Sequence, residues 1–175
     1  MISEESESGN DTVSLVPANK ENVDTLANLN AVLFPITYQK KFYIDCLACG
    51  PYTVMAQLNG SIVAAICCRL ETHQDLGVRL YIMTLGVLAP YRRRGIANAL
   101  LGHALRLAQQ DPRIVDTYLH VQLGNEEAIA FYRSNGFELI ATIKNYYKRI
   151  RPADCFVFSC NLRNWQPRNS CLNHA

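Results

Sequence analysis

The chain has 175 residues, 49% of them hydrophobic, and is long enough to bury the core of one domain or of two small ones. Its 17 lysines and arginines nearly balance its 15 aspartates and glutamates, which leaves a net charge of +2. The composition excludes a disordered, collagen-like or coiled-coil chain. The charge balance argues against a protein held on nucleic acid or on an anionic membrane by bulk charge, so we expect neither as a direct partner.

The first residues of the chain are acidic. Glu4, Glu5, Glu7 and Asp11 occur there without any lysine or arginine, which is the opposite of the start of a secretory signal. No apolar run approaches the roughly 18 residues that a membrane span requires. We therefore expect residues 1–11 to form a flexible acidic leader. We also expect a soluble protein of the cytoplasm, with the nucleus as a second location.

Seven cysteines are spread through the chain. Their odd number and the absence of a secretory signal argue against a disulfide framework. Cys46 and Cys49 form a C-x-x-C pair, but this pair ends a helical stretch and has no second pair to complete a zinc site. Cys67 and Cys68 are adjacent, so a strand would point them to opposite faces. We expect buried, reduced thiols and no metal site.

The first half of the chain predicts one strand, two helices and three further strands. Pro35 ends the first helix, and the pair Gly50-Pro51 closes the second. Asn59-Gly60 lies between two apolar, β-prone runs, which is a strong signal for a hairpin. The expected ranges are a strand at 13–16, helices at 17–33 and 38–49, and strands at 52–58, 61–71 and 78–88.

In the second half, the apolar period changes to that of a helix. Alanines and leucines recur at three- and four-residue spacing from Ala97 to Ala108, which predicts one apolar helical face. The remaining expected elements are a strand at 117–122, a helix at 126–134 and strands at 137–143 and 155–162. This order fits a single α+β domain over residues 12–162, with a central mixed, mostly antiparallel sheet flanked by helices. Residues 163–175 are expected to form a polar C-terminal tail.

The most informative segment is a basic turn between the long strand and the helix with the apolar face. It reads Tyr91-Arg92-Arg93-Arg94-Gly95-Ile96-Ala97. The first turn of a helix has unpaired N–H groups and a partial positive charge, and small residues let an anion approach the backbone. Together with three arginines, this predicts an anion site suited to a pyrophosphate. A solvated basic turn and a nucleotide-phosphate site stay open, because the arginines do not by themselves name the anion.

Two motifs carry a resemblance to a known family. The pattern R-x-x-G-x-A at 92–97 resembles the acyl-CoA signature of the GCN5-related N-acetyltransferases, the GNAT family. The pattern N-x-x-A-x-x-F-Y at 125–132, followed by Asn-Gly-Phe at 135–137, is similar to the second half of that signature. Segments at 34–38, 79–86, 88–93, 118–122 and 145–154 resemble the San-type subfamily, which forms the catalytic subunit of the N-terminal acetyltransferase E complex, NatE. The resemblance covers about residues 12–162 and implies the GNAT fold.

The resemblance implies a protein N-α-acetyltransferase that uses acetyl-CoA as co-substrate. It assigns acetyl-CoA to the end of the long strand, to the basic turn and to the helix at 126–134 with the residue before it. These positions are Leu85, Gly86, Val87, Arg92, Arg93, Arg94, Gly95, Ile96, Ala97, Asn125 and Tyr132. A free strand amide can stabilise the oxyanion that forms when an amine attacks a thioester. Asn125 also fits a helix N-cap, and Tyr132 also fits core packing.

The resemblance gives Tyr81 and His120 the removal of the amine proton through ordered water. A protein α-amine has a pKa of about 7.7–8, so much of it is protonated at neutral pH. The ordinary pKa of histidine, about 6.5, suits a general base, whereas tyrosine acts directly only if its pKa is lowered. A hydrogen-bonded core histidine is the alternative. No cysteine is placed as a nucleophile, so we expect direct attack in a ternary complex. Strand alternation predicts one shared face for Tyr81, Met83 and Leu85, and another for Tyr118, His120 and Gln122.

The resemblance makes two apolar loops the clamp for the substrate peptide. One rim is Phe34, Pro35, Ile36 and Tyr38 with Met83 across from it, and the other is Tyr146, Tyr147 and Ile150. It implies a preference for chains that retain the initiator Met and continue with an apolar residue, since a thioether packs well against aromatic side chains. Ile36-Thr37 stands where the subfamily commonly has Val-Ser, which adds a methylene to the pocket wall.

Two alternatives to this function stay open, one of them an enzyme and the other from a different class of protein. One is a lysine acetyltransferase of the same fold, and the other is a regulatory, non-catalytic subunit of an N-terminal acetyltransferase complex. The implied partners are nascent or mature Met-initiated protein N-termini. The resemblance also implies docking on the auxiliary and catalytic subunits of the N-terminal acetyltransferase A complex at the ribosome.

Overall fold

The structure is a computed structural model that describes residues 12–75, 77–148 and 150–167. Its strands are β1 (Val13–Pro17), β2 (Val54–Leu58), β3 (Ser61–His73), β4 (Gly77–Val87), β5 (Ile114–Gln122), β6 (Glu138–Ile143) and β7 (Cys155–Asn161). Its α-helices are α1 (Val23–Leu33), α2 (Lys40–Ala48), α3 (Ile96–Gln110) and α4 (Glu126–Ser134), with short 3₁₀ helices at Gly50–Tyr52 and Ala89–Tyr91. The predicted order of strands and helices is confirmed.

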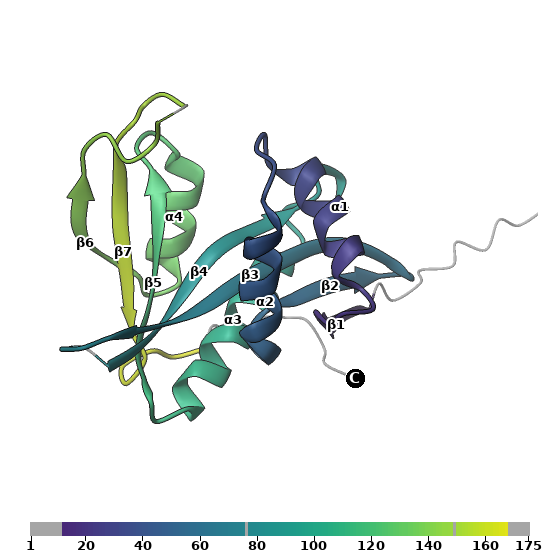
Figure 1. Ribbon diagram of the computed structural model, residues 1–175, viewed down its shortest axis with the longest axis horizontal. Helices are drawn as coiled ribbons and strands as arrows, with labels where there is room; N and C mark the ends of the chain where they lie inside the picture. Colours follow the sequence, from purple (N-terminus) through teal and green to yellow (C-terminus); the bar gives the residue numbers. More distant parts are fainter. Residues whose placement is uncertain (1–11, 76, 149, 168–175) are drawn as a thin grey trace, which may run out of the picture.

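All seven strands form one sheet in the order β1-β2-β3-β4-β5-β7-β6. Neighbouring strands are antiparallel except β4 and β5, which are parallel, so the predicted mixed and mostly antiparallel sheet is confirmed. The parallel pairing runs only from Val78 to Tyr81 on β4 and from Ile114 to Tyr118 on β5. Beyond these residues the two strands separate, and the sheet opens into two arms (Figure 1).

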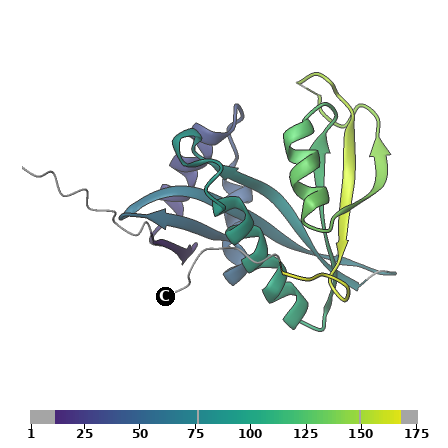
Figure 2. The ribbon, with the colours of Figure 1, turned by 180° about the vertical axis from the view of Figure 1, so that it is seen from behind.

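The helices cover both faces of this sheet. Helices α1 and α2 lie on the front of the arm formed by β1–β4 (Figure 1), and α3 and α4 lie on the opposite face (Figure 2). Each face has its own core. The apolar side of α3, which includes the fully buried Leu100, Leu101 and Leu105, packs in the larger core with α4, and Leu26 of α1 packs in the smaller one. The apolar helical face predicted from the three- and four-residue spacing is therefore confirmed.

The predicted helix at 17–33 starts later than expected, at Val23. The Oδ1 atom of Asn19 accepts hydrogen bonds from the N–H groups of Glu21 and Asn22, at 2.8 and 3.0 Å. The side chain of Asn22 in turn bonds the N–H of Asn19 at 2.8 Å and the carbonyl of Pro17 at 3.0 Å. These side-chain bonds satisfy the backbone in a turn and so compete with helix formation, which explains the late start.

A β-bulge at Met83 overturns one prediction about the long strand. The two neighbours of Met83 pair with the adjacent residues Cys67 and Cys68 of β3, so Met83 is the extra residue. Met83 packs in the core under α1 and α2, whereas Leu85 packs in the core under α3 and α4. The prediction that Tyr81, Met83 and Leu85 share a face is therefore wrong for Leu85, because the bulge turns that side chain to the opposite face.

The expected end of the domain at residue 162 is too early. Trp165 is only 6% exposed and belongs to the larger core. The side-chain amide of Gln109 on α3 donates to the carbonyls of Leu162 and Trp165, at 2.9 and 3.2 Å. The first residues of the predicted polar tail therefore belong to the fold. The rest of that tail, residues 168–175, and the predicted leader at 1–11 lie outside the described residues.

The cysteines of the described segments are buried and free. Cys67 lies in the smaller core and Cys68 in the larger one, which confirms that they point to opposite faces of β3. Cys46 and Cys49 are divided between the two cores in the same way. The described residues contain no cluster of three or more His, Cys, Asp and Glu side chains that could hold a metal ion. None of the helices in these segments is both long and apolar enough to cross a membrane.

Candidate active site

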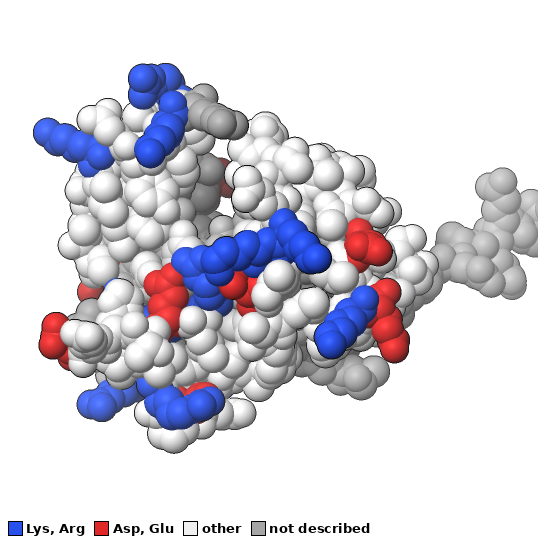
Figure 3. All heavy atoms as spheres, viewed as in Figure 1, with Lys and Arg blue, Asp and Glu red and all other residues white. Residues whose placement is uncertain are grey.

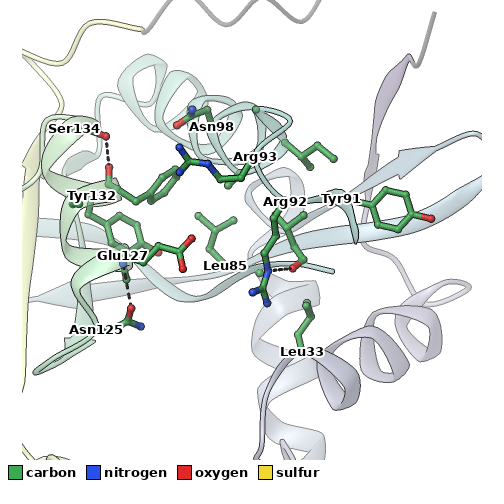
Figure 4. A pocket seen from close by; sticks show the side chains of 18 of the residues that line it. Leu33, Leu85, Tyr91, Arg92, Arg93, Asn98, Asn125, Glu127, Tyr132 and Ser134 are labelled. Atoms are coloured by element: carbon green, nitrogen blue, oxygen red, sulfur yellow. Dashed lines mark hydrogen bonds between the residues drawn. The ribbon is translucent and has the colours of Figure 1, made fainter. Parts of the chain in front are cut away.

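A cavity of about 890 Å³ opens where β4 meets the start of α3 and faces α4 (Figure 4). Most of the residues to which the resemblance assigned acetyl-CoA line it. The lining includes Leu85, Gly86, Val87, Arg92, Arg93, Gly95, Ile96, Ala97, Asn125 and Tyr132. The end of β4, the basic turn with the start of α3, and α4 therefore meet at this cavity.

The start of α3 has the features of an anion site. Gly95, which precedes the helix, has φ 79°, and no side chain caps the first turn. Arg93 also has a positive φ, 64°. Turns of this kind gather N–H groups into a concave surface, and the helix dipole adds partial positive charge. The first N–H groups of α3 therefore point to the cavity without a side-chain partner, as binding of a pyrophosphate requires.

The side chains of the three arginines of the basic turn point in different directions. Arg93 reaches into the cavity toward α4, and Arg92 reaches toward Leu33 on the other side (Figure 4). Nε of Arg92 donates to the carbonyl of Val87 at 3.1 Å, which fixes this side chain against β4. The guanidinium of Arg94 lies 5.7 Å from the centre of the Tyr91 ring instead, so a contact of Arg94 with acetyl-CoA stays a prediction.

The end of β4 presents backbone N–H groups to the gap between the two arms. The N–H of Leu88 donates to the carbonyl of Val63 on β3 at 2.9 Å, whereas the carbonyl of Val87 accepts from Arg92 on the other side. Successive peptide groups of a strand point in opposite directions, so the N–H groups of Leu85 and Val87 point away from β3. They face the gap that β5 leaves when it separates from β4.

Helix α4 contributes Asn125, Glu127 and Tyr132 to the other wall (Figure 4). The Oδ1 atom of Asn125 accepts the N–H of Ala128 at 3.1 Å, so its N-cap role is confirmed and its binding role stays a prediction. Tyr132 is only 8% exposed and contacts the ring of Phe137, yet it also lines the cavity. Core packing and cavity lining therefore coexist at Tyr132.

Tyr81 and His120 meet on the face of the sheet that carries α1 and α2. The Tyr81 hydroxyl oxygen lies 3.1 Å from His120 Nδ1, just where β4 and β5 separate. Burial lowers the pKa of His120 below its usual range, and the Glu71 carboxylate partly opposes this. Burial, followed by the neighbouring Tyr146, raises the pKa of Tyr81 well above its usual range. At neutral pH the imidazole is therefore neutral and the phenol stays protonated.

The two predicted rims of the peptide clamp lie on either side of this pair. On one rim the Tyr38 ring stacks on Phe42 at 4.1 Å and meets the Phe34 ring edge-on at 6.0 Å. On the other rim Tyr146 stacks on the His120 ring at 4.5 Å. Tyr146 also meets Tyr147 edge-on at 4.9 Å, and burial raises the pKa of Tyr147 to about 12.

Burial is also the main reason that the pKa of Tyr38 rises to about 12, followed by the neighbouring Cys67 and Tyr43. Pro35, Ile36 and Ile150 are exposed, and the latter two present 50% and 37% of their surface to solvent. Apolar side chains at the mouth of the clamp are therefore free to meet a peptide.

Several residues of this region escaped the sequence analysis. Leu33, Asn98 and Glu127 line the cavity, but nothing in their local pattern marks them. Phe131 lines it too and was given no role, although it belongs to the N-x-x-A-x-x-F-Y pattern. On the opposite face, Arg69 and Glu71 lie on β3 beside Tyr81, and the Tyr118 hydroxyl donates to Glu71. Two charged residues at alternate positions of a strand otherwise rich in apolar residues are a sequence signal for such a polar face.

Comparison with known proteins agrees with this geometry. The sequence profile of the acetyltransferase (GNAT) family matches residues 23–137. N-alpha-acetyltransferase 50 of Danio rerio is 47% identical over 152 residues, which are 87% of this chain and 90% of the relative. The probable N-acetyltransferase san of Drosophila melanogaster is 41% identical over 159 residues, 91% of this chain and 86% of the relative.

A solved structure has a similar fold. Naa50 of Arabidopsis thaliana, in complex with the bisubstrate analogue CoA-Ac-MVNAL, superimposes with a TM-score of 0.80 at 48% identity. The match covers 85% of this chain and 97% of that protein. The profile match, the identity to two relatives over most of both chains and the separated parallel strands lead to one conclusion: the chain belongs to the acetyltransferase (GNAT) family.

Proposed function

We propose that this enzyme transfers the acetyl group of acetyl-CoA to the α-amine of proteins that retain the initiator Met before an apolar residue. One observation carries the proposal: the Tyr81–His120 pair and its aromatic rims lie directly at the point where β4 and β5 separate. An amine held there faces the backbone at the end of β4. The analogue bound by the Arabidopsis relative carries the peptide MVNAL, which begins with Met and an apolar residue.

The residues around the cavity fit acetyl-CoA. The uncapped start of α3 and the guanidinium groups of Arg92 and Arg93 supply donors for a pyrophosphate. The N–H groups of Leu85 and Val87 are free to hold the thioester carbonyl and to stabilise the oxyanion of the transition state. When bound, acetyl-CoA supplies the acetyl group as a thioester that an amine can attack. Every other task falls to backbone and side-chain groups of the chain itself.

The Tyr81–His120 pair supports removal of the amine proton. If the imidazole proton is on Nε2, Tyr81 donates to Nδ1, and Tyr81 can pass its proton to His120 as it takes one from water. If the proton is on Nδ1, the Tyr81 oxygen accepts, and Nε2 takes the proton through water. In both cases the proton ends on His120, which is neutral at the start because its pKa is lowered. The raised pKa of Tyr81 supports an orienting role rather than that of a free base.

The chemistry of the rims supports an apolar N-terminal dipeptide. Phe34, Tyr38 and Met83 bring apolar surface to one side, and Tyr146 and Tyr147 bring it to the other. A Met side chain is flexible and polarisable and packs well in such surroundings. A carboxylate would instead be expected beside the ε-ammonium of a lysine substrate, and the predicted residues of the rims contain none.

The cellular setting is part of the same proposal. Its basis is the resemblance to San-type enzymes, which supports action in the cytoplasm and the nucleus, within NatE on the subunits of the N-terminal acetyltransferase A complex. Val32 of α1 and Ile44 of α2 are 74% and 54% exposed. Apolar side chains on these two helices would suit contact with another protein.

Turnover with matched peptides tests the proposal. Purified enzyme and acetyl-CoA are supplied with a Met-Leu peptide, a Ser-initiated peptide of otherwise equal sequence, and a Met-Leu peptide with a blocked N-terminus and an internal lysine. We expect acetylation of the Met-Leu peptide at its α-amine, located by tandem mass spectrometry, and much slower reaction of the other two. Equal rates on all three, or none on Met-Leu, would reject the proposed substrate.

A further inference from the structure

A charged network lies beside the Tyr81–His120 pair and has no part in the function proposed above. Its centre is Glu71 of β3, whose side chain is 21% exposed. One carboxylate oxygen of Glu71 accepts from Arg69 Nε at 2.9 Å. The other accepts from the Tyr118 hydroxyl and lies 3.8 Å from Nε2 of His73. Glu71 therefore ties β3 to β5 across β4.

The network restrains Tyr118 through two contacts, one at its hydroxyl and one at its ring. Its hydroxyl is anchored by Glu71, and the Arg79 guanidinium lies 4.1 Å from the centre of its ring. Arg79 is itself fixed by Asp116, to which both Nε and a terminal nitrogen donate at 2.6 Å. A side chain restrained in this way can act as a rigid wall for its neighbours.

The Tyr118 ring also lies next to the Tyr81–His120 pair. Its centre lies 4.9 Å from the centre of the Tyr81 ring and 6.0 Å from that of His120. The guanidinium of Arg69 lies 5.3 Å from the centre of the Tyr81 ring. The Tyr81 ring therefore meets two members of the Glu71 network, and small shifts in either would move its hydroxyl relative to His120 Nδ1.

We infer that Glu71 and Tyr118 are positioning residues for the reaction: Tyr118 fixes the Tyr81 ring, and the Glu71 carboxylate stabilises the protonated form of His120. The inference rests on the proposed function, because it needs His120 to carry the proton of the amine. A carboxylate that stabilises the imidazolium makes the proton transfer more favourable while the imidazole still starts neutral.

The protonation states of the network agree with this arrangement. Burial alone would raise the pKa of Glu71, but the bonds from Tyr118 and Arg69 outweigh it and lower the pKa, so Glu71 is ionised. Burial and the Glu71 carboxylate raise the pKa of Tyr118 well above its usual range, so its hydroxyl is a donor. The chain thus places an ionised carboxylate behind a neutral phenol, and the ring centre of that phenol lies 6.0 Å from that of His120.

Other charged and titratable groups face this site from each neighbouring element. Beside Glu71 are Arg69 and His73 on β3, Arg79 on β4 and Tyr118 on β5, while Asp45 of α2 and Asp116 of β5 pair with the two arginines. Around His120 are Tyr81, Tyr118 and Tyr146. Loss of the Glu71 charge leaves Arg69 and Arg79 less neutralised, and both changes disfavour an imidazolium at His120. The expected direction is therefore unambiguous: the pKa of His120 falls.

Three variants separate positioning from mere stability. Glu71→Gln keeps the size and removes the charge, and Tyr118→Phe keeps the ring and removes the hydroxyl. Asp111→Asn is the matched control, because it removes a carboxylate that pairs with Arg113 and Tyr52 at the far end of α3. Circular dichroism and titration with acetyl-CoA check that each variant folds and binds its co-substrate.

Two readouts test the inference. The first is NMR titration of the His120 ring in the enzyme alone, assigned by the signal that His120→Gln removes. We expect the pKa of His120 to fall by about half a unit or more in Glu71→Gln, and to stay unchanged in Asp111→Asn. The second is kcat against pH with acetyl-CoA and the Met-Leu peptide, where Tyr118→Phe lowers kcat several-fold at an unchanged KM for acetyl-CoA.

The outcomes are distinguishable from failure of the proposed function. The NMR titration needs no turnover, so it tests the link between Glu71 and His120 even if the Met-Leu peptide is not a substrate. An unchanged pKa of His120 in Glu71→Gln overturns the electrostatic role. Lower thermal stability of Tyr118→Phe with wild-type kcat and pH profile overturns the positioning role.

Discussion

Replacing His120 with alanine removes the imidazole whose Nδ1 lies 3.1 Å from the Tyr81 hydroxyl. General-base catalysis contributes about 10²–10⁴-fold to a rate, which corresponds to about 2.7–5.4 kcal/mol of barrier. The Tyr81 hydroxyl is still present in His120→Ala and still has Tyr146 as a neighbour, so it can still orient water. We therefore expect His120→Ala to lower kcat near pH 7.5 at the lower end of that range, by about 100-fold.

The effect has a pH dependence whose sign follows from the site. The pKa of His120 lies below its ordinary range because the ring is buried, so the wild-type imidazole is neutral and active throughout the neutral range. As the pH falls through that pKa, the wild-type enzyme loses its base, whereas His120→Ala has none to lose. The ratio of the two kcat values is therefore greatest at neutral pH and falls toward one in acid.

The assay is kcat against pH from about 5 to 9, with saturating acetyl-CoA and a Met-Leu peptide, accompanied by calorimetric titration of acetyl-CoA. His103→Ala is the matched control, since His103 lies on α3 and contacts the carbonyl of Pro51 rather than the site. We expect His120→Ala to bind acetyl-CoA like the wild type. A variant that keeps more than a third of wild-type kcat at pH 7.5, or a ratio independent of pH, would show that His120 is not the base.

Three further predictions concern the cavity and the core. Gly95→Val forces a branched side chain into a residue with φ 79°, and should cost about 1–2 kcal/mol in urea unfolding and raise the Kd of acetyl-CoA. Asn125→Ala removes the N-cap of α4 and should cost about 1 kcal/mol, whereas Asn125→Asp keeps the cap. If the Asn125 amide also binds acetyl-CoA, calorimetry should find weaker binding in Asn125→Asp at unchanged Tm. Trp165→Ala empties a buried site and should cost about 3–5 kcal/mol, measured as a lower Tm, with kcat of the folded enzyme retained.

Much of the fold could be predicted because local sequence signals set the turns and the ends of its helices and strands. The Asn59-Gly60 turn, with φ values of 49° and 81°, has the backbone form that this pair favours in a hairpin. Helix α4 begins after the Asn125 cap and ends at Ser134, as its capping and stop residues predict. The late start of α1 could also have been predicted, because Asn19 and Asn22 are three residues apart and asparagine favours such turns.

The β-bulge at Met83 could not be predicted in the same way. A bulge depends on how two strands pair, and residues 80–85 contain no glycine that would mark one. The contact of Tyr118 with Glu71 could not be predicted either. The two residues are 47 positions apart in the sequence, and they lie on strands that are separated by β4 in the sheet. Periodicity describes one strand at a time, whereas both features are properties of neighbouring strands.

The bulge at Met83 also explains how one strand can serve two binding sites. Tyr81 and Met83 face α1 and α2, where the proposed peptide site lies, whereas the side chain of Leu85 is turned into the core under α3 and α4. Without the extra residue, strand alternation would direct Leu85 to the peptide face as well. With it, the peptide face keeps room beside Tyr81, while the N–H groups of Leu85 and Val87 point into the gap left by β5. The amine side and the thioester side of the reaction are therefore brought together by the backbone of β4, and the side chains on each face are left to provide specificity.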